Sequence, residues 1–334
     1  MKRLAVVGAS NMARVRTEAF LSLGSCRLCG VASRRSQRAQ AFAEAFGCPN
    51  YTDDYRTLVD VKPDVVLVAV PHDVQDEVVL WSLEQGFHTL VGGCLARRID
   101  TAERIVDLAR TKGVVVETGY EARYKRVWER TKELLDEEVI GTLVAVRSVA
   151  LYPAPPDSWY YNEQQSGGMV LTHMSYAFIN PLRWLLGTPH TVAAFANKKH
   201  QMAEGNVKHE MCTANFLFGN DVICNMVAGF VKPRQLDAWH IDFIGTTGSL
   251  SLHPGDLVAG SLTLYPDDQA PVRYSFEDDD AFTKQVQTFL DSVDGYGSNL
   301  NPASDSVIDI RLADLIVKSI EERTTLNYGV VGNV

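Results

Sequence analysis

Three titratable side chains could move protons in this sequence: Glu121 and Tyr124, which follow a predicted strand, and His173, which lies in an apolar helical pattern. General acid–base catalysis needs a side chain that takes or gives a proton at the reacting group of the substrate. We predict that His173, Glu121 and Tyr124 are the catalytic residues. The structural alternatives are a packing histidine at a helix start for His173, and a salt bridge to Arg123 or Lys125 for Glu121.

An aromatic segment made rigid by prolines, Tyr152 to Tyr161, lies between a predicted strand and a predicted helix. Flat aromatic rings can stack on the face of a sugar or on a conjugated ring. We therefore predict that Trp159 and Tyr160 bind a cyclic small-molecule substrate. Packing inside the protein is the alternative for these rings.

The segment Gly8-Ala9-Ser10-Asn11-Met12-Ala13 directly follows an apolar strand and opens a helix. A glycine-rich turn in this context places backbone N–H groups and a helix N-terminus at the phosphates of a dinucleotide. Gly8 suits the tight turn, but Ser10 takes the position at which a glycine lets the backbone approach the pyrophosphate. We predict a dinucleotide site that includes Gly8, Ser10, Asn11 and Met12. The alternative is an ordinary turn capped by Ser10 or Asn11.

The residues after the second predicted strand bear on the choice of cofactor. An NAD-selective domain places an acidic side chain here to bind the ribose 2′-hydroxyl, whereas this chain has Ser33, Arg34 and Arg35. A hydroxyl and guanidinium groups suit a 2′-phosphate. We predict that Ser33 and Arg34 bind the cofactor and that NADP(H) is favoured over NAD(H). Solvated arginines at a helix start are the alternative.

Composition and charge argue against several other classes. The chain has 334 residues, 46% of them hydrophobic, and a net charge of −9, which opposes binding to nucleic acid or to an anionic membrane surface. No apolar run reaches the roughly 18 residues of a membrane span, and the N-terminus lacks a signal-peptide pattern. The spacing of His173, His240 and Glu121 matches no metal site. We expect a cytoplasmic protein with reduced cysteines and no metal, nucleic-acid or membrane partner.

Short β-branched runs alternate with amphipathic helical patterns up to residue 118. The predicted strands are Leu4–Val7, Leu28–Ala32, Val65–Val70, Thr89–Val91 and Val114–Glu117, and the predicted helices are Met12–Leu23, Ser36–Phe46, Val74–Gln85 and Thr101–Lys112. Continuous Val/Leu strands separated by helices predict a parallel sheet that is covered on both faces. Residues 1–118 are therefore predicted to form a doubly wound Rossmann domain that binds a dinucleotide.

Residues 119–334 show longer strands, tight turns and fewer helices. Strands are predicted at Thr142–Leu151, Thr191–Ala196, Met211–Phe218, Asp221–Gly229, Ala238–Gly245, Ser249–His253 and Leu262–Tyr265, and helices at Val127–Leu135, Val170–Leu186, Phe282–Val293 and Ser304–Ile320. We predict an α/β domain that binds substrate and carries an open, mostly antiparallel sheet. An apolar open face favours a homodimer or homotetramer formed through this sheet.

Five short motifs resemble, in the same order, those of the glucose–fructose oxidoreductase and inositol dehydrogenase family (Gfo/Idh/MocA). They are Val68-Ala69-Val70-Pro71-His72, Gly86-Phe87-His88-Thr89-Leu90-Val91, Gly119-Tyr120-Glu121-Ala122-Arg123-Tyr124, Ser166-Gly167-Gly168 and Gly245-Thr246-Thr247-Gly248-Ser249-Leu250. The resemblance covers nearly the whole chain and implies a nicotinamide cofactor, sugar-like substrates and oligomers built through the open sheet. We add Pro71, His72 and Gly92 to the predicted cofactor-binding residues, and Arg123, Tyr176, Asn180 and His240 to the predicted substrate-binding residues.

The same resemblance shows departures at the positions that carry this family's chemistry. Gly92-Gly93-Cys94 stands where the family has Glu-Lys-Pro, so Gly93 replaces the lysine that polarises or deprotonates the substrate hydroxyl. On the following helix, Ala177 replaces the family's histidine and His173 its aspartate. Three further replacements are His72 for asparagine, Glu121 for asparagine and Asn180 for aspartate. The family's usual acid–base set is therefore missing.

These departures allow more than one activity. We predict an NAD(P)-dependent oxidoreductase that transfers a hydride to or from a sugar-like or other cyclic small molecule through a different proton relay. The alternatives are a catalytically silent dinucleotide-binding regulator or scaffold and a lyase that recycles a bound nucleotide. A further alternative is a reductase resembling the biliverdin reductases, which share the fold, also lack the lysine and histidine, and act on a substrate that needs little acid–base help.

Overall fold

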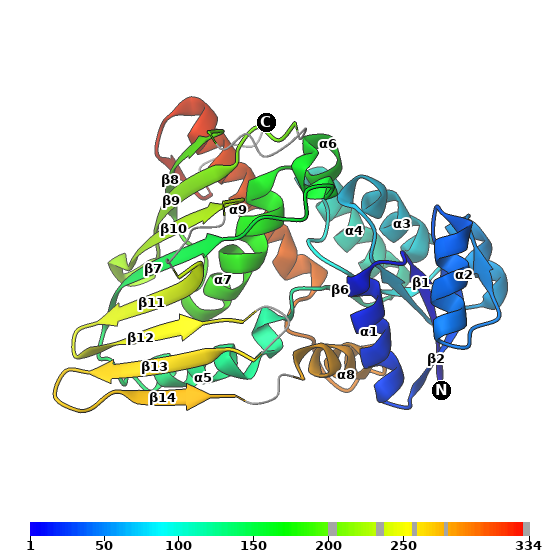
Figure 1. Cartoon of the computed structure of the whole chain (residues 1–334), viewed down its shortest axis with the longest axis horizontal. Helices are drawn as coiled ribbons and strands as arrows, with labels where there is room; N and C mark the ends of the chain where they lie inside the picture. Colours follow the sequence, from blue (N-terminus) through cyan, green and yellow to red (C-terminus); the bar gives the residue numbers. More distant parts are fainter. Residues whose placement is uncertain (200–205, 232–236, 256–258, 277–279, 330–334) are drawn as a thin grey trace. The chain divides into compact units, whose positions relative to one another are not determined.

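The computed structural model describes residues 1–199, 206–231, 237–255, 259–276 and 280–329, and it divides into two compact units (Figure 1). Within these ranges, the first unit contains residues 1–121 and 280–310, and the second contains residues 122–279 and 311–334. Helix α8 (Ala281–Val293) therefore belongs to the first unit, although in the chain it follows the strands of the second. The sequence predicted two contiguous domains, residues 1–118 and 119–334. The structure differs in that residues 280–310 return to the first unit.

The first unit is built on a six-stranded parallel sheet with the strand order β3-β2-β1-β4-β5-β6. The order reverses between β1 and β4, which is the topology of a dinucleotide-binding fold and confirms the predicted Rossmann class. Its strands are β1 (Lys2–Val7), β2 (Cys26–Ala32), β3 (Tyr51–Thr52), β4 (Val65–Val68), β5 (His88–Val91) and β6 (Val116–Thr118). Its α-helices are α1 (Asn11–Ser22), α2 (Ser36–Ala45), α3 (His72–Glu84), α4 (Ile99–Lys112) and α8, together with the first residues of α9 (Ala303–Glu322).

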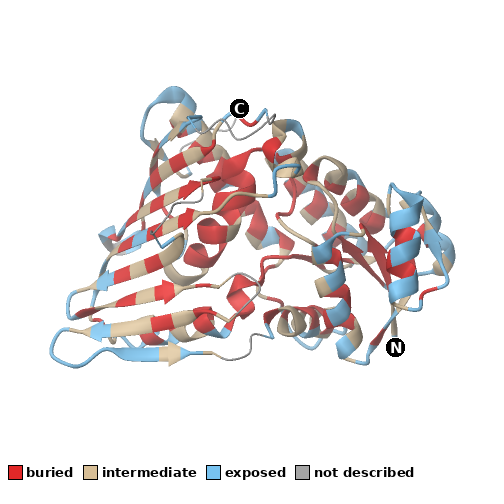
Figure 2. Ribbon diagram, in the orientation of Figure 1, coloured by how far each residue is buried: buried red, intermediate tan, exposed pale blue. Residues whose placement is uncertain are grey.

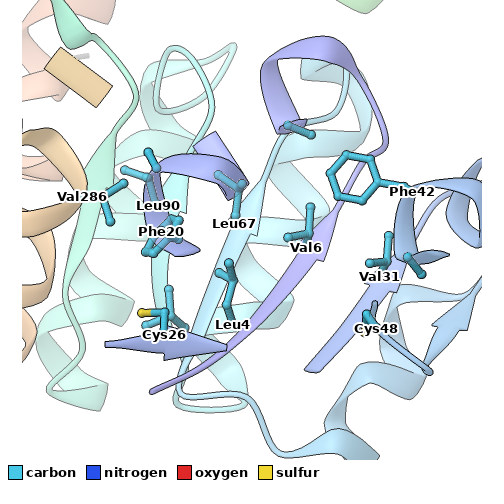
Figure 3. Close-up of a cluster of buried hydrophobic side chains, with 14 of the residues drawn as sticks. Leu4, Val6, Phe20, Cys26, Val31, Phe42, Cys48, Leu67, Leu90 and Val286 are labelled. Atoms are coloured by element: carbon cyan, nitrogen blue, oxygen red, sulfur yellow. The ribbon is translucent and has the colours of Figure 1, made fainter. Parts of the chain in front are cut away.

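Alternate residues of the central strands pack against the helices. Leu4 and Leu67 lie in a core cluster with Phe20 of α1 and Phe289 of α8, as Figure 3 shows for several of its members. The rings of Phe20 and Phe289 meet edge to face, with their centroids 6.2 Å apart. Val66, which points to the other face, is also fully buried. Because both faces are covered, the strands are continuous apolar runs, as the sequence pattern predicted.

The second unit carries a nine-stranded sheet with the order β14-β13-β12-β11-β7-β10-β9-β8-β15. Among the described strands of this second sheet, only β7 and β10 pair in parallel. The prediction of a mostly antiparallel sheet is therefore confirmed. The strands are β7 (Leu143–Leu151), β8 (Thr191–Asn197), β9 (Met211–Leu217), β10 (Ile223–Gly229), β11 (Trp239–Gly245), β12 (Gly248–His253), β13 (Ser261–Pro266), β14 (Val272–Ser275) and β15 (Leu326–Asn327). Buried and more exposed residues alternate along them (Figure 2), so one face packs against helices and the other is open.

The helix predicted over Val170–Leu186 is present, but its first part departs from α-helical geometry. Residues Val170–Ile179 form a π-helix (η4), in which the backbone N–H of Asn180 reaches the carbonyl of Ser175, and the α-helix α7 (Asn180–Leu186) begins only after it. Pro181 lies in the first turn of α7. A proline cannot donate a backbone hydrogen bond and clashes with the carbonyl four residues earlier, which disfavours one continuous α-helix. This unit also contains the α-helix α5 (Arg126–Asp136).

The six cysteines are all free and buried, as expected for strand and core positions. Among the helices of the described ranges, none combines the length and the apolar composition that crossing a membrane requires.

Candidate functional site

At the carboxyl edge of the first sheet, the backbone segments that follow β1 and β4 approach each other closely. Gly8 has φ +114°, and a Cβ at this position would lie 2.1 Å from the carbonyl oxygen of Ala69. Only glycine fits there. Ser10 caps α1 by accepting a hydrogen bond from the backbone N–H of Ala13 at 3.1 Å. The turn is therefore tight, and the N-terminus of α1, with Asn11 and Met12 in its first turn, opens at the point where this fold holds a pyrophosphate.

Exposed positive charge follows β2 at the same edge. Ser33 is half-buried, whereas Arg34, Arg35 and Arg38 are exposed. None of these three arginines forms an ion pair with a described residue, in contrast to Arg56 and Arg98, which do. Unneutralised guanidinium groups attract an anion such as a 2′-phosphate.

Pro71 and His72 follow β4 at the start of α3, and the segment after β5 packs against them. The Sγ atom of Cys94 lies 3.5 Å from both ring nitrogens of His72, and a Cβ at Gly93 would lie 3.4 Å from Nε2. The backbone N–H of Gly92 donates to the carbonyl of Val68 at 2.7 Å. Gly92, Gly93 and Cys94 thus bring their backbone close to the imidazole, at the same sheet edge as Gly8.

Glu121 is buried in an ion pair with Arg16 of α1, with 3.7 Å between Nη2 and Oε2. Arg16 also donates to the carbonyl of Gly119 and to Oε1 of Gln285, the latter at 2.7 Å, and its guanidinium lies over the ring of Phe282. The sequence alternatives named Arg123 or Lys125 as the partner of Glu121, whereas this ion pair is with Arg16, far away in the chain. A buried carboxylate that is already paired holds the end of β6 in place. Its catalytic role stays a prediction.

His173 lies on η4 and is fully buried against the inner face of the second sheet. Its ring centroid is 3.8 Å from that of Tyr152 and 5.3 Å from that of Phe230. Neither ring nitrogen makes a hydrogen bond of ordinary geometry with a described residue. Burial lowers the pKa of His173 to about 3, and the backbone of Ala150 offsets only part of this effect. The imidazole is therefore neutral at neutral pH, and its assignment as proton donor stays a prediction.

A hollow of about 190 Å³ lies beside η4 in the second unit. It is lined by Ala122, Lys125, Trp128, Tyr176, Ala177, Trp239, Pro254 and Gly255. The buried ammonium of Lys125 donates to the carbonyl of Gly255 at 2.7 Å. This volume includes space open to solvent, and no enclosed space for a water-sized molecule lies within it, so the hollow is not itself a ligand pocket. Lys125 was not among the predicted substrate-binding residues, although it directly follows the Gly119–Tyr124 motif.

The other predicted substrate residues lie in three places. The guanidinium of Arg123 donates to the backbone carbonyl of Asn180 at 2.9 Å, and both residues are buried, as is Tyr124. Trp159 and Tyr160 are half-buried and meet edge to face, with their centroids 4.5 Å apart. His240 lies on the open face of β11, next to Asp242 and Asp237, whereas its neighbour Trp239 lies on the inner face with Tyr176.

Two groups of predicted residues therefore come together, each within its own unit. The first is the cofactor set at the carboxyl edge of β1, β2, β4 and β5. The second is the set on η4, which includes His173 and Tyr176. His240 is separated from this set, because successive residues of a strand point to opposite faces of the sheet. Within the described residues, no cluster of three or more His, Cys, Asp or Glu side chains is arranged to hold a metal ion.

Comparison with known proteins extends these observations to the whole chain. Residues 2–120 match the family described as "Oxidoreductase family, NAD-binding Rossmann fold", and residues 132–328 match its C-terminal alpha/beta domain. The chain is 23% identical to a D-glucoside 3-dehydrogenase of Escherichia coli K12, over 96% of both chains. It is 25% identical to a D-xylose 1-dehydrogenase (NADP(+)) of Haloferax volcanii, over 87% of this chain and 89% of that one.

A solved levoglucosan dehydrogenase, in complex with NADH and levoglucosan, superposes with a TM-score of 0.85 at 17% identity, covering 98% of this chain and 99% of that one. This likeness shows that the two proteins share a fold. The matched families cover both halves of the chain and describe oxidoreductases that bind NAD(P). The predictions of the family and of an NAD(P)-dependent oxidoreductase are thereby confirmed, and the chain belongs to the Gfo/Idh/MocA oxidoreductase family.

Proposed function

We propose that this protein is an NADP(H)-preferring oxidoreductase that transfers a hydride between the nicotinamide and a secondary alcohol or ketone of a sugar-like ring. The observation that carries the proposal is the carboxyl edge of the first sheet, where Gly8 makes the tight turn into α1, and where the arginines after β2 form no ion pair with a described residue. The dinucleotide supplies or accepts the hydride when bound. The names of the relatives above, a glucoside, a xylose and a levoglucosan dehydrogenase, support a carbohydrate substrate.

The preference for NADP(H) rests on the residues after β2. Arg34 offers a guanidinium to a 2′-phosphate and Ser33 a hydroxyl, and no acidic side chain stands there to accept hydrogen bonds from a ribose 2′-hydroxyl. One relative is named for NADP(+) and one neighbour holds NADH, so the relatives support both cofactors, and the residues after β2 favour NADP(H).

Fluorescence titration tests this preference. Wild-type protein should bind NADPH more tightly than NADH. Arg34→Ala should weaken NADPH binding by about 1.5–3 kcal/mol, the contribution of a charge-assisted hydrogen bond, and NADH binding hardly at all. Arg110→Ala is the control, since this exposed arginine ends α4 at the opposite edge of the same sheet. An equal loss for both cofactors in Arg34→Ala would contradict the proposed preference.

A panel of sugars, keto sugars, imines and linear tetrapyrroles then tests turnover, followed by NADPH absorbance. Oxidation of a sugar alcohol or reduction of a keto sugar is the expected result. Binding of NADPH without turnover on any of these would support the catalytically silent regulator. Turnover of the tetrapyrrole alone would support the biliverdin-reductase-like alternative.

We also propose that a second copy of the chain covers the open face of the second sheet. Apolar side chains stand exposed on it: Phe195 of β8 is 63% exposed and Ile223 of β10 is 57% exposed. Patches of this kind are unusual in monomers. Sedimentation velocity should give a dimer or tetramer, and Ile223→Asp should shift it toward the 37.0 kDa monomer. A wild-type monomer at micromolar concentration would overturn this assignment.

The free cysteines support a reducing compartment, and we place the enzyme in the cytoplasm on that ground.

A further inference from the structure

His72 lies where a dinucleotide-binding sheet presents its ligand. It is the first residue of α3, and residues 69–71 connect it to the carboxyl end of β4, which neighbours β1 at the point where the strand order reverses. Open α/β sheets bind ligands outside the carboxyl ends of the strands at this reversal. The imidazole therefore lies at the edge of the sheet at which a dinucleotide would bind.

Glycine at position 93 leaves room for this imidazole. A Cβ there would lie 3.4 Å from Nε2 of His72, in ordinary van der Waals contact, so position 93 lies directly against the ring. Position 93 has no side chain, and His72 is the titratable side chain that the described structure places beside it. The two residues lie at the ends of the adjacent strands β5 and β4.

The ring is held by one face of α3. His72, Gln75 and Asp76 are three and four residues apart, and they therefore share a face of the helix. Gln75 donates to the carbonyls of Cys94 and Leu95 at 2.8 and 3.4 Å, and Asp76 binds Arg97 at 3.4 Å. The segment after β5 is thus clamped onto α3, which fixes the imidazole between the two strands.

Asp73 directly follows His72 on α3, and further charged and titratable groups lie near the ring and near Cys94 in the described structure. Asp76 on α3 is paired with Arg97, and Asp309 on α9 acts electrostatically on Cys94. Burial raises the pKa of the Cys94 thiol, so its sulfur stays neutral and serves as a packing neighbour of the imidazole. An imidazole can both accept and donate a proton at a substrate oxygen near neutral pH, which a neutral thiol and a carboxylate paired with arginine do less readily.

We propose that His72 is the residue that exchanges a proton with the substrate oxygen at the nicotinamide, an assignment that rests on the proposed oxidoreductase function. In the oxidative direction, the substrate C–H bond breaks and its hydride, with both electrons, passes to the oxidised nicotinamide. The O–H bond breaks, a C=O bond forms, and the proton passes to the unprotonated ring nitrogen of His72. Solvent then takes the proton from the imidazolium. Reduction runs through the same groups in reverse.

Cofactor affinity tests the proximity without any substrate. A protonated imidazole beside the nicotinamide repels the cationic ring of NADP⁺ but not the neutral ring of NADPH. In wild-type protein the ratio of the Kd of NADP⁺ to the Kd of NADPH should rise about fivefold or more from pH 8 to pH 5.5, the range in which an imidazole titrates. His72→Asn and His72→Gln, which carry no titratable group, should give a ratio that does not change with pH.

Two control variants assign the effect. His88→Asn removes a histidine at the start of β5, at the opposite edge of the same sheet, and should retain the wild-type pH dependence. Asp107→Asn removes an exposed carboxylate of α4 and should also retain it. If both His72 variants keep the wild-type pH dependence while binding NADPH, the inference on His72 fails and the proposed function stands. If wild-type protein binds neither cofactor, both fail together.

Turnover gives the second readout once the substrate panel yields an active compound. His72→Asn should lower kcat by roughly 10²–10⁴-fold and abolish the limb of its pH profile that reports the base. The Kd of NADPH should change by much less. Unchanged kcat in His72→Asn would overturn the assignment.

Discussion

The carboxyl edge of the first sheet and the inner face of the second sheet each hold a buried histidine, and their surroundings differ in kind. His72 lies among backbone groups, a thiol and a glycine at an edge built to receive a ligand. His173 lies between the rings of Tyr152 and Phe230, without a hydrogen bond of ordinary geometry to a described residue. The neighbours of a titratable group, more than its residue type, decide whether it can exchange a proton.

The largest expected effect of a substitution is in the first region, because the backbone at Gly8 leaves no space for a side chain. Gly8→Ala puts a methyl group 2.1 Å from the carbonyl oxygen of Ala69 at a positive φ. The strain and the clash should cost about 3 kcal/mol or more and should weaken NADPH binding by at least about 100-fold. Urea denaturation and fluorescence titration measure the two effects.

Gly113→Ala provides the matched control. Gly113 also has a positive φ, +66°, but nothing lies within 4 Å of its Cβ position at the end of α4. It should lose only about 1 kcal/mol and keep its cofactor affinity. Equal behaviour of the two variants would mean that the approach to Ala69 does not matter.

The second region should respond to pH through stability. His173 has a pKa of about 3 in the fold and an ordinary pKa of about 6.5 when unfolded. Between these values the unfolded chain binds the additional proton, so the free energy of unfolding falls by about 1.4 kcal/mol for each unit that the pH drops below about 6.5. Above pH 6.5 this contribution is fully present.

His173→Phe tests this contribution because an aromatic ring keeps the packing against Tyr152 and Phe230 but cannot take up a proton. Between pH 6.5 and 5, the wild-type protein should lose about 2 kcal/mol more stability than the variant. Denaturant midpoints at several pH values measure the difference. If His173→Phe instead kept the wild-type pH dependence and lost turnover, the catalytic assignment made from the sequence would be favoured over His72.

The sequence predicted those features that depend on local pattern. Continuous Val runs such as Val65–Val68 identified the buried parallel strands, and the turn at Gly8 identified the dinucleotide edge. Features that depend on distant partners were not accessible. The pairing of Glu121 with Arg16, more than a hundred residues earlier, has no local signal. A helix was predicted over Val170–Leu186, but apolar spacing alone does not distinguish an α-helix from the π-helix that precedes Pro181.

The same limit applies to the site. The sequence assigned His72 to cofactor binding and treated Gly93 only as the replacement of the family's lysine. The fold brings the ends of β4 and β5 together and places Gly93 against the ring of His72, and no local pattern in the sequence signals this contact. His240 was assigned to the substrate, although the alternation along β11 places it on the open face.

The smallest expected effect distinguishes capping from cofactor binding in the first region. Ser10 accepts a hydrogen bond from the backbone N–H of Ala13 and also occupies the position at which a glycine would let a pyrophosphate come closer. Ser10→Ala should cost about 1 kcal/mol of stability through the lost cap, whereas Ser10→Gly should cost only a few tenths, because glycine is tolerated as an N-cap. NADPH should bind Ser10→Gly as tightly as wild-type protein or more tightly, since the side chain no longer stands between α1 and the phosphates. Thermal denaturation and fluorescence titration of both variants measure this. Weaker NADPH binding by Ser10→Gly than by Ser10→Ala would mean that the hydroxyl itself binds the phosphate and that the departure from glycine serves the cofactor.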